Sequence, residues 1–529
     1  MKKKTLLSIM IILMVVFTST NVEARRTRPT QGPKYVFYFI GDGMALPQIH
    51  ATEAYLAQSA MPDNPTGNPG GLTGYSTGEP DANLLASMDT AGAAKLVMSQ
   101  FPVLGLQTTY ANNRFITGSA ASATALSCGE KTTINTIAMD KFKALPFNTI
   151  AEKAQAKGMK VGVVSSVSID HATPACFYAH QPERGLYWDI SNNLSDSGFD
   201  YFAGGGMKGE RIRDGKRYYA PGRPDADASN DPVEYAKTNG YTVASNAAEL
   251  AAVAPGTKCF AYSKDYIDGS WALPYEMDRD PADLSLADYT AEGIRLMDNS
   301  NGFFMMVEAG KLDWACHAND AVAAIKDNIA LDDAVAVAVD FYQQHPTETL
   351  IVVTGDHECG GMTLGFAGTG YETAFEILDG QTMSYEVFDW TEFAAHKASF
   401  GSYETWDPAI NMNDDIKARI QNAFGLVYDD LSLFEVSTLE QAYDDSMSGK
   451  EIAGGTNDSL LYGYYEPFTV TLTHIMNRRA GIAFTSYSHT AVPVPVYALG
   501  YDAWRFAGNY DNTDVALKMA QAMRVNLGN

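Results

Sequence analysis

The chain has 529 residues and a formal net charge of −25, with 63 acidic side chains against 38 lysines and arginines. This acidity excludes a general nucleic-acid binder, because few basic groups are available to neutralise a phosphate backbone. A small anionic substrate is compatible with the charge, since a bound metal inverts the local field. The length predicts either two domains or one large domain with insertions.

Residues 1–24 have the features of a secretory signal. Three lysines at positions 2–4 precede an apolar stretch over residues 5–17, and small residues near Ala24 provide a cleavage site. The apolar stretch is short for a membrane span, although an uncleaved anchor is the alternative. We therefore expect a periplasmic or secreted protein with no membrane span after removal of the signal.

In chain order, strand-like runs alternate with helical ones. The apolar run Tyr35–Ile40 predicts a strand, and the Pro/Gly/Asn-rich residues 61–82 predict an exposed loop. Small residues over Ala120–Ser127, closed by a glycine two residues later, predict a short buried helix with a C-terminal cap. A helix over Thr149–Lys157 then precedes a strand over Val161–Ser165.

The same alternation continues further along the chain. Strands are predicted over Phe303–Val307, Leu350–Thr354 and Pro493–Leu499, and a helix over Ala321–Tyr342. This order predicts an α/β fold in which helices cover both faces of a mostly parallel central sheet, as in a three-layer sandwich.

The alternation stops between about Phe366 and Phe484, where aromatic and acidic residues are frequent. One short amphipathic helix, with Ile416, Ile420 and Phe424 on one face, stands out there. The simplest organisation is a catalytic domain built from residues 25–366 and 484–529, interrupted by an insertion over residues 367–483.

The cysteines give no sign of a disulfide scaffold. Their count of five is odd, and no two of them form a Cys-x-x-Cys pair. We interpret all of them as small buried residues rather than metal ligands.

Aspartates and histidines gather in four short islands beside predicted strands. The islands are I-G-D-G-M at 40–44, the segment 307–317, V-T-G-D-H-E at 353–358 and S-H-T at 488–490. An open α/β sheet builds its active site at the carboxyl ends of its strands, and aspartate and histidine are ligands that suit zinc. A single aspartate at such a position is commonly a helix cap, but four islands with the same chemistry predict a metal site.

Two further residues point to phosphoryl chemistry. Ser119 stands at the predicted start of the small-residue helix, where backbone N–H groups and the helix dipole favour an anion. Arg184 follows H-A-T-P at 171–174, and its guanidinium could bind two oxygens of a phosphoryl group.

The ordered set of motifs resembles the alkaline phosphatases. The set comprises I-G-D-G-M, T-G-S-A-A-S-A-T-A, H-A-T-P-A, V-E-x-x-x-x-D-x-x-x-H, D-H-E and S-H-T. The resemblance covers most of the chain outside the signal and the insertion. It implies metal-dependent hydrolysis of phosphate monoesters through a phosphoserine, with two zinc ions and a third site that usually holds magnesium.

The resemblance also implies roles for individual residues. Ser119 would be the nucleophile, and Arg184 would bind the phosphate. The implied ligands are Asp42, Asp356, His357 and Ser119 for one zinc; Asp313, His317 and His489 for the second zinc; and Glu308, Thr173 and the other oxygen of Asp42 for the third site.

The sequence departs from the family's pattern at three positions. His171 stands where the best-known bacterial members have aspartate, Trp314 where they have lysine, and Gly118 where they have the aspartate before the nucleophile. The His/Trp pair resembles a subset of bacterial members and is placed at the third metal site or phosphate pocket. An imidazole there would favour zinc or cobalt over magnesium, so the identity of the third metal stays open. The alternatives are a surface role for His171 and a turn cap for Thr173.

Other functions have to be weighed against a phosphomonoesterase. A sulfatase would carry Cys/Ser-x-Pro-x-Arg, which is absent around Ser119, and diesterases tend to lack the third metal site. A non-catalytic phosphate- or glycan-binding protein would need no nucleophile. We therefore expect an enzyme that acts on small phosphate monoesters, has no specific nucleic-acid partner, and has a homodimer as a candidate assembly.

Overall fold

The computed structural model describes residues 32–59, 94–209, 212–213, 216–217, 231–263, 270–370, 373–400, 406–407, 411–450, 452 and 454–529. The predicted signal at 1–24 and the predicted loop at 61–82 lie outside these residues. Among the described residues, no helix is both long and apolar enough to cross a membrane.

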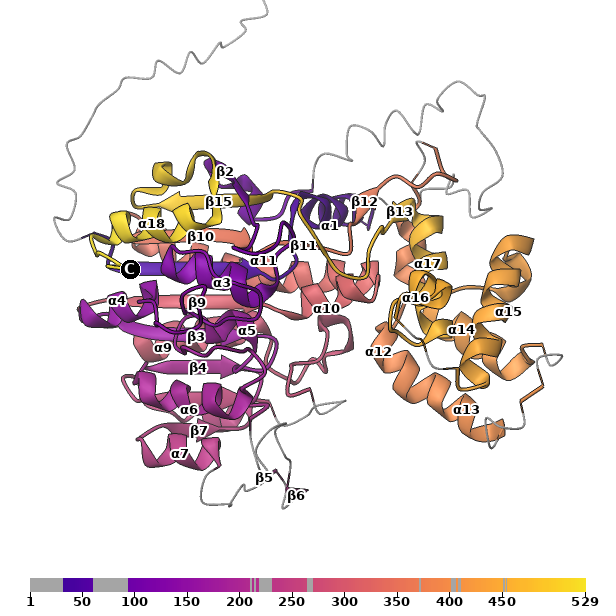
Figure 1. Cartoon of the computed structure of the whole chain (residues 1–529), viewed down its shortest axis with the longest axis horizontal. Coiled ribbons are helices and arrows are strands. Elements are labelled where there is room, and N and C mark those ends of the chain that lie inside the picture. The colour runs from indigo at the N-terminus through magenta and orange to yellow at the C-terminus, as the bar shows by residue number, and fades with distance from the viewer. Residues whose placement is uncertain are drawn as a thin grey trace, which may run out of the picture.

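A ten-stranded sheet forms the centre of the molecule (Figure 1). Its pairings are parallel except those of β15, which runs antiparallel to both β10 and β2. This arrangement confirms the predicted α/β fold with a mostly parallel sheet. In spatial order the strands are β16 (Gly508–Asp511), β2 (Val103–Thr108), β15 (Val494–Gly500), β10 (Thr349–Gly355), β1 (Tyr35–Gly41), β9 (Phe303–Ala309), β3 (Lys160–Ser165), β4 (Tyr201–Gly204), β8 (Cys259–Tyr262) and β7 (Thr242–Ala244).

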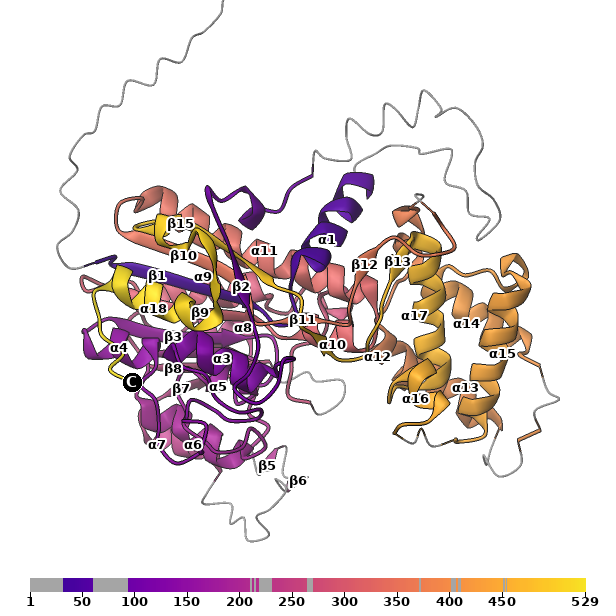
Figure 2. The same ribbon diagram turned by 45° about the horizontal axis from the view of Figure 1, so that its top comes forward.

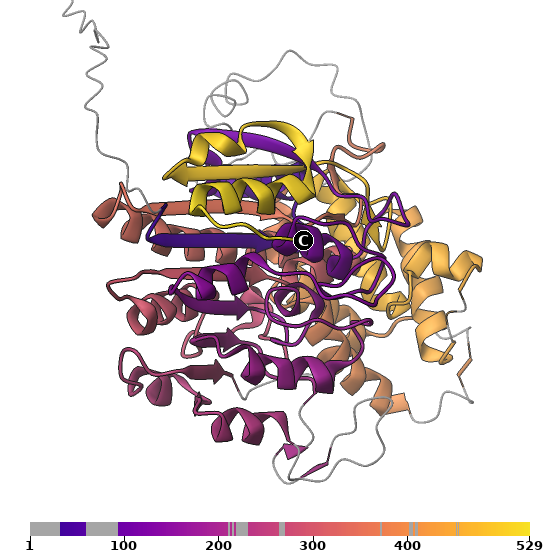
Figure 3. The same ribbon diagram turned by 60° about the vertical axis from the view of Figure 1, so that its left-hand side comes forward.

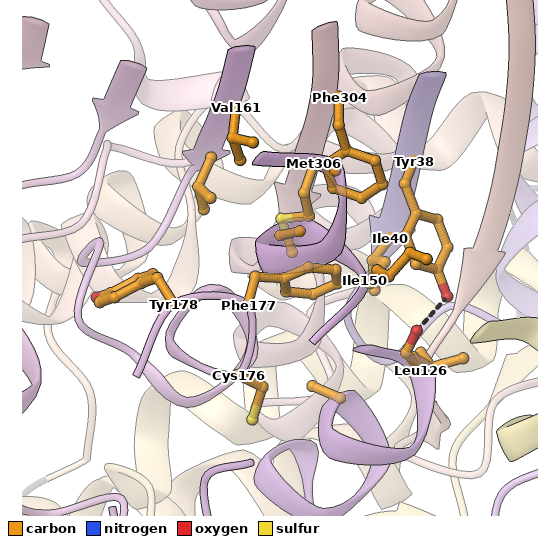
Figure 4. Packing of buried hydrophobic residues seen from close by; sticks show 14 of the residues in the cluster. Tyr38, Ile40, Leu126, Ile150, Val161, Cys176, Phe177, Tyr178, Phe304 and Met306 are labelled. Carbon is orange, nitrogen blue, oxygen red and sulfur yellow. Dashed lines mark hydrogen bonds between the residues drawn. The ribbon is translucent and has the colours of Figure 1, made fainter. Parts of the chain in front are cut away.

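The composition of β1 explains its central place. Tyr38 and Ile40 are buried on one face of the sheet, and Phe37 and Phe39 are buried on the other. A parallel strand covered on both faces has a continuous apolar sequence of this kind. Figure 4 shows the first face, where the Tyr38 hydroxyl donates a hydrogen bond of 3.3 Å to the carbonyl oxygen of Leu126.

Helices pack on both faces of the sheet, as Figure 3 shows from the side. One face carries α3 (Ser119–Cys128), α4 (Ile150–Ala156), α5 (Ala172–Ala175), α6 (Tyr187–Ser197), α7 (Pro232–Thr238) and α18 (Asn512–Met523). The other face carries α1 (Leu46–Ser59), α8 (Ala247–Ala251), α9 (Leu286–Met297), α10 (Lys311–His317) and α11 (Ala321–Gln344).

The described residues between 375 and 480, called the helical segment below, lie beyond the carboxyl ends of the parallel strands (Figure 2). The segment has its own apolar cluster, which includes Phe388, Leu439 and Phe468. The predicted helix with three apolar residues on one face is confirmed as α14. The elements are η4 (Phe375–Gly380), α12 (Tyr385–Val387), η5 (Phe388–Phe393), α13 (Ala394–Phe400), α14 (Asp414–Phe424), η7 (Tyr428–Asp430), α15 (Leu433–Met447), α16 (Asn457–Tyr462) and α17 (Pro467–Ala480). The boundaries of an insertion at 367–483 stay a prediction.

Candidate active site

Three of the four islands meet at one edge of the sheet. The last residues of β1, β9 and β10 are register partners, so the three strands end at the same level. Asp42 and Asp356 directly follow two of these strands, and Glu308 lies near the end of the third. The fourth island arrives through the two-residue strand β14 (His489–Thr490), which pairs with β11 (Glu358–Cys359). All three acidic side chains are fully buried.

Ser119 is the first residue of α3. The preceding Gly118 is extended, with φ −112° and ψ 161°, and the helix ends at Gly129, whose φ of 72° suits a glycine cap. All ten residues of α3 are buried, which explains why the sequence uses only small side chains and one leucine there. The Ser119 hydroxyl oxygen lies 3.3 Å from Nε2 of His357.

The first group of predicted ligands surrounds this imidazole. Nε2 of His357 is 3.3 Å from Oδ1 of Asp42 and 3.1 Å from Oδ2 of Asp356. Within the described residues, these two carboxylate oxygens have no hydrogen-bond partner. Buried polar atoms are normally paired, so the convergence of these oxygens with a serine hydroxyl and an imidazole nitrogen fits a bound cation.

The second group lies between α10 and β14. Nε2 of His317 is 3.1 Å from Nε2 of His489, and it is 3.3 Å from Oδ2 of Asp313. The four-residue spacing of Asp313 and His317 places both on one helical face, as predicted. Nδ1 of His317 donates to the carbonyl oxygen of Tyr487 at 2.6 Å, and Nδ1 of His489 donates to that of Thr117 at 2.8 Å. A neutral ring whose proton lies on Nδ1 directs its Nε2 lone pair at the other histidine, so these two nitrogens could bind one metal ion in place of a shared proton.

The third group combines Asp42, Glu308 and Thr173. The Thr173 hydroxyl donates to Oδ2 of Asp42 at 3.3 Å, while Oε2 of Glu308 accepts a hydrogen bond from Ser165. Oε1 of Glu308 is buried and has no partner among the described residues. His171 lies close enough to Asp42 and Glu308 for the three to offer ligand atoms to one ion.

Arg184 lies against His171. Its Nη2 is 2.9 Å from Nε2 of His171, and the imidazole also packs edge-on against Trp314, with ring centroids 5.8 Å apart. Burial, and then the charge of Arg184, hold the pKa of His171 well below its usual value. A neutral His171 therefore accepts a hydrogen bond from the guanidinium.

Burial and close charges shift the pKa values of several groups in the site. Among the protein groups alone, burial and the charge of Asp356 raise the pKa of Asp42 well above its usual range. Burial raises the pKa of Glu308 to about 8. Burial opposes a proton on His317, but the charge of Asp313 outweighs it and raises the pKa to about 9. Divalent cations would replace these protons with a charge fixed in place.

Comparison with known proteins identifies the family to which the chain belongs. The profile of the alkaline phosphatase family matches residues 84–525, which is well over half of the chain. The chain belongs to the alkaline phosphatase family. It is similar to alkaline phosphatase 4 of Bacillus subtilis (strain 168), with 29% identity over 488 residues that cover 91% of this chain and 87% of that protein. Alkaline phosphatase 3 of the same organism is 28% identical over 429 residues, which cover 80% and 81% of the two chains.

The fold comparison agrees with the sequence comparison. The crystal structure of a cold-active alkaline phosphatase from a psychrophilic Shewanella species has 27% identity and a TM-score of 0.68. The match covers 92% of this chain and 99% of that one. This alkaline phosphatase is therefore a metal-dependent phosphate monoester hydrolase, as the sequence motifs predict.

One residue of this alkaline phosphatase site was missed by the sequence reasoning. All five cysteines are buried free thiols, as expected. Cys359, however, offers its sulfur to the second group, within 4.8 Å of the ligand atoms of Asp313, His317 and His489. Its thiol donates to the carbonyl oxygen of Asp313 at 3.6 Å. The signal available in the sequence was its position three residues after Asp356, directly after the island at 353–358.

The contact with Arg184 restricts what His171 can do at the third group. If Nε2 accepts the hydrogen bond from Arg184, the ring proton lies on Nδ1, and neither nitrogen is free to bind a metal. Nδ1 of His171 is buried and has no hydrogen-bond partner among the described residues.

A cavity of about 410 Å³ lies behind the second group of this alkaline phosphatase. Its walls come from α16, α17 and the loop that contains Tyr487. Tyr487, whose carbonyl oxygen accepts the hydrogen bond from His317, lines this cavity, and none of the proposed ligands does. The cavity is therefore next to the site but does not contain its reacting groups.

Proposed function

We propose that this enzyme transfers the phosphoryl group of a small phosphate monoester first to Ser119 and then to water. The observation that carries the proposal is the place of the Ser119 hydroxyl, at the start of a buried helix and 3.3 Å from Nε2 of His357. A hydroxyl at a helix start lies where N–H groups favour the anionic form and the phosphate.

The phosphoryl group is transferred in two steps. In the first step, the bond between Ser119 Oγ and phosphorus forms while the bond between phosphorus and the ester oxygen breaks. The serine proton passes to solvent, and the departing alcohol takes a proton from solvent. In the second step, a water oxygen bonds to phosphorus and the bond to Ser119 Oγ breaks, which releases inorganic phosphate and restores the hydroxyl.

Three metal ions fit the donor sets described above. We assign one zinc to Asp42, Asp356, His357 and Ser119, and a second zinc to Asp313, His317 and His489. When bound, such ions supply the positive charge that activates a hydroxyl or a water and stabilises a leaving oxygen. Magnesium is the ion that we assign to the third site, because the oxygen donors there suit a hard cation.

Arg184 is the proposed phosphate-binding cation. Its guanidinium offers several donors in a fixed plane, which suits the oxygens of a phosphoryl group. We propose that His171, through its hydrogen bond of 2.9 Å, holds this guanidinium in place before substrate binds. Trp314 supports the imidazole from its edge.

We also propose an export signal at residues 1–24, a periplasmic or secreted location, and a subdomain at 367–483 that interrupts the catalytic domain. The apolar cluster of the helical segment supports the last of these proposals. A homodimer remains a prediction.

The proposal is tested by turnover of p-nitrophenyl phosphate and bis-p-nitrophenyl phosphate in the presence of zinc and magnesium. We expect much faster turnover of the monoester, and we expect Ser119→Ala to lose nearly all of it while keeping its metals. Quenching the native enzyme with acid during turnover should trap phosphoserine at position 119. A wild-type rate in Ser119→Ala would reject the nucleophile, and a preference for the diester would reject the substrate class.

A further inference from the structure

We propose that Glu386, in the helical segment, is a positioning residue for the phosphate site, acting through Lys311, Trp314 and His171 on Arg184. This inference rests on the proposed function of Arg184, and it gives the helical segment a role in catalysis. Every contact in the series joins buried or partly buried side chains of the described residues.

The series begins at a buried lysine on α10, the helix that also carries Asp313 and His317. Lys311 is only 1% exposed. Its ammonium lies 2.9 Å from Oε2 of Glu386, 3.7 Å from the centre of the Tyr275 ring and 4.7 Å from that of the Trp314 ring. A buried ammonium requires a partner of this kind, because removal from water is costly for an unpaired charge.

Glu386 is itself held firmly against the catalytic part of the chain. It lies in α12, whose first residue, Tyr385, donates its N–H to Oδ2 of Asp320 at 2.9 Å. The N–H of Ser384 donates to Oδ1 of Asp278, also at 2.9 Å. The two residues just before Glu386 are thus hydrogen-bonded to the catalytic part of the chain.

From Lys311 the series continues to the phosphate site. The Trp314 ring contacts both the Lys311 ammonium and the His171 imidazole, which it meets at 74° with centroids 5.8 Å apart. His171 in turn contacts Arg184 through a hydrogen bond of 2.9 Å. A shift of the Trp314 ring would therefore move the His171 imidazole relative to the Arg184 guanidinium.

Without the charge of Glu386, the Lys311 ammonium would be attracted mainly by two other carboxylates. Asp278 and Asp327 both lie within the electrostatic reach of its ammonium. We expect the ammonium to shift toward them and away from Trp314, so that His171 loses part of its support. Arg184 would then lose more freedom when it closes on phosphate.

The test is Glu386→Gln in the full-length enzyme loaded with zinc and magnesium. We expect the inhibition constant of inorganic phosphate to rise by a factor of about 2 to 12, the cost of ordering one loosened side chain. Bound zinc should remain at the wild-type level. Amide hydrogen exchange in a peptide covering residues 311–317 should become faster, both with and without metals, which gives a readout independent of turnover.

The matched control is Asp389→Asn, which removes the same charge from the same segment. Asp389 faces Lys397 at 3.5 Å, and no contact connects that pair to α10 in the described part of the chain. Phosphate inhibition and exchange should therefore stay at the wild-type level in the control. Glu386→Asp should weaken phosphate binding less than Glu386→Gln does, because it keeps the negative charge beside Lys311.

If Glu386→Gln does not fold, the double variant Lys311→Met with Glu386→Leu removes the whole pair without leaving a buried charge. It should show the same weakening of phosphate binding. Unchanged phosphate inhibition and unchanged exchange at 311–317, in either variant, would overturn the proposal. A Ser119→Ala enzyme with full turnover would instead overturn the proposed function and leave these measurements interpretable.

Discussion

Replacing Gly118 by aspartate tests how this enzyme holds Arg184. The resemblance to the alkaline phosphatases implies an aspartate at this position that helps to hold the phosphate-binding arginine. The backbone at Gly118 is extended, and an added Cβ would meet only Cδ1 of Ile134, at 3.9 Å. The variant should therefore fold without strain, and any change in phosphate binding reports on the new carboxylate.

The expected magnitude follows from the present partner of the arginine. Ordering one long side chain on binding costs about 0.5–1.5 kcal/mol, or a factor of about 2 to 12 in affinity. Because His171 already contacts Arg184 at 2.9 Å, most of this cost is already met, and the gain from Gly118→Asp should lie near the factor of 2. Without His171, the same substitution should approach the factor of 12.

The assay is the inhibition constant of inorganic phosphate in four proteins: native, Gly118→Asp, His171→Ala and the double variant. Gly118→Asn, which has the shape of aspartate without its charge, is the control, and metal content is measured in parallel. Turnover at saturating substrate should fall if phosphate release is the slow step. Weaker phosphate binding in both Asp variants would show that repulsion dominates, and equal effects in both backgrounds would show that His171 does not hold Arg184.

Three other changes give clear expectations. Treatment with EDTA should abolish turnover and lower the melting temperature, and zinc should restore both, because the buried carboxylates otherwise face one another; calorimetry checks this. His489→Ala should lose about one zinc per chain by elemental analysis, since the Asp356 and His357 group stays intact. Burial lowers the pKa of His180, but the contact with Glu152 outweighs this effect and raises it above 6.5. Burial raises the pKa of Glu152, but its hydrogen bonds with His180 and the Thr149 N–H outweigh this effect and lower it below 4.5. Their ion pair should therefore stabilise the fold between about pH 4.5 and 6.5 and lose this effect as the pH rises through the pKa of His180. Because the pair is partly exposed, Glu152→Gln should cost less than about 1 kcal/mol in that window and less still at pH 9, measured by urea unfolding.

The parts of the site that follow local rules could be predicted from the sequence. The ends of β1 and β10 were readable because both strands are continuous apolar runs that stop at Asp42 and Asp356. The start of α3 was readable from its small residues and its terminal glycine. The pairing of Asp313 with His317 needed only helical spacing.

The parts that depend on contacts between distant segments could not be predicted. Cys359 reaches the second group because β11 pairs with β14, which carries His489. Each of these strands has only two residues, which is too short for a periodic signal in the sequence. The contact between Lys311 and Glu386 joins residues 75 positions apart. Helix α17 was missed because most of its residues are buried, so that it has no exposed face, and because its first half contains three threonines and a valine, β-branched residues with a low helix propensity.

The second group shows how the backbone prepares this chain for a metal. The carbonyl oxygens of Tyr487 and Thr117 can only accept hydrogen bonds, so each must receive the Nδ1 proton of its histidine. The Nε2 atoms of His317 and His489 then face each other across 3.1 Å. Without a metal, a proton lies between them, because burial opposes that proton but the charge of Asp313 outweighs burial and raises the pKa of His317 to about 9. Two Nε2 lone pairs repel unless a cation or a proton lies between them. A metal bound by both histidines would also hold the loop before β14 through the Tyr487 carbonyl, so the stability of that loop and the affinity for the metal should change together.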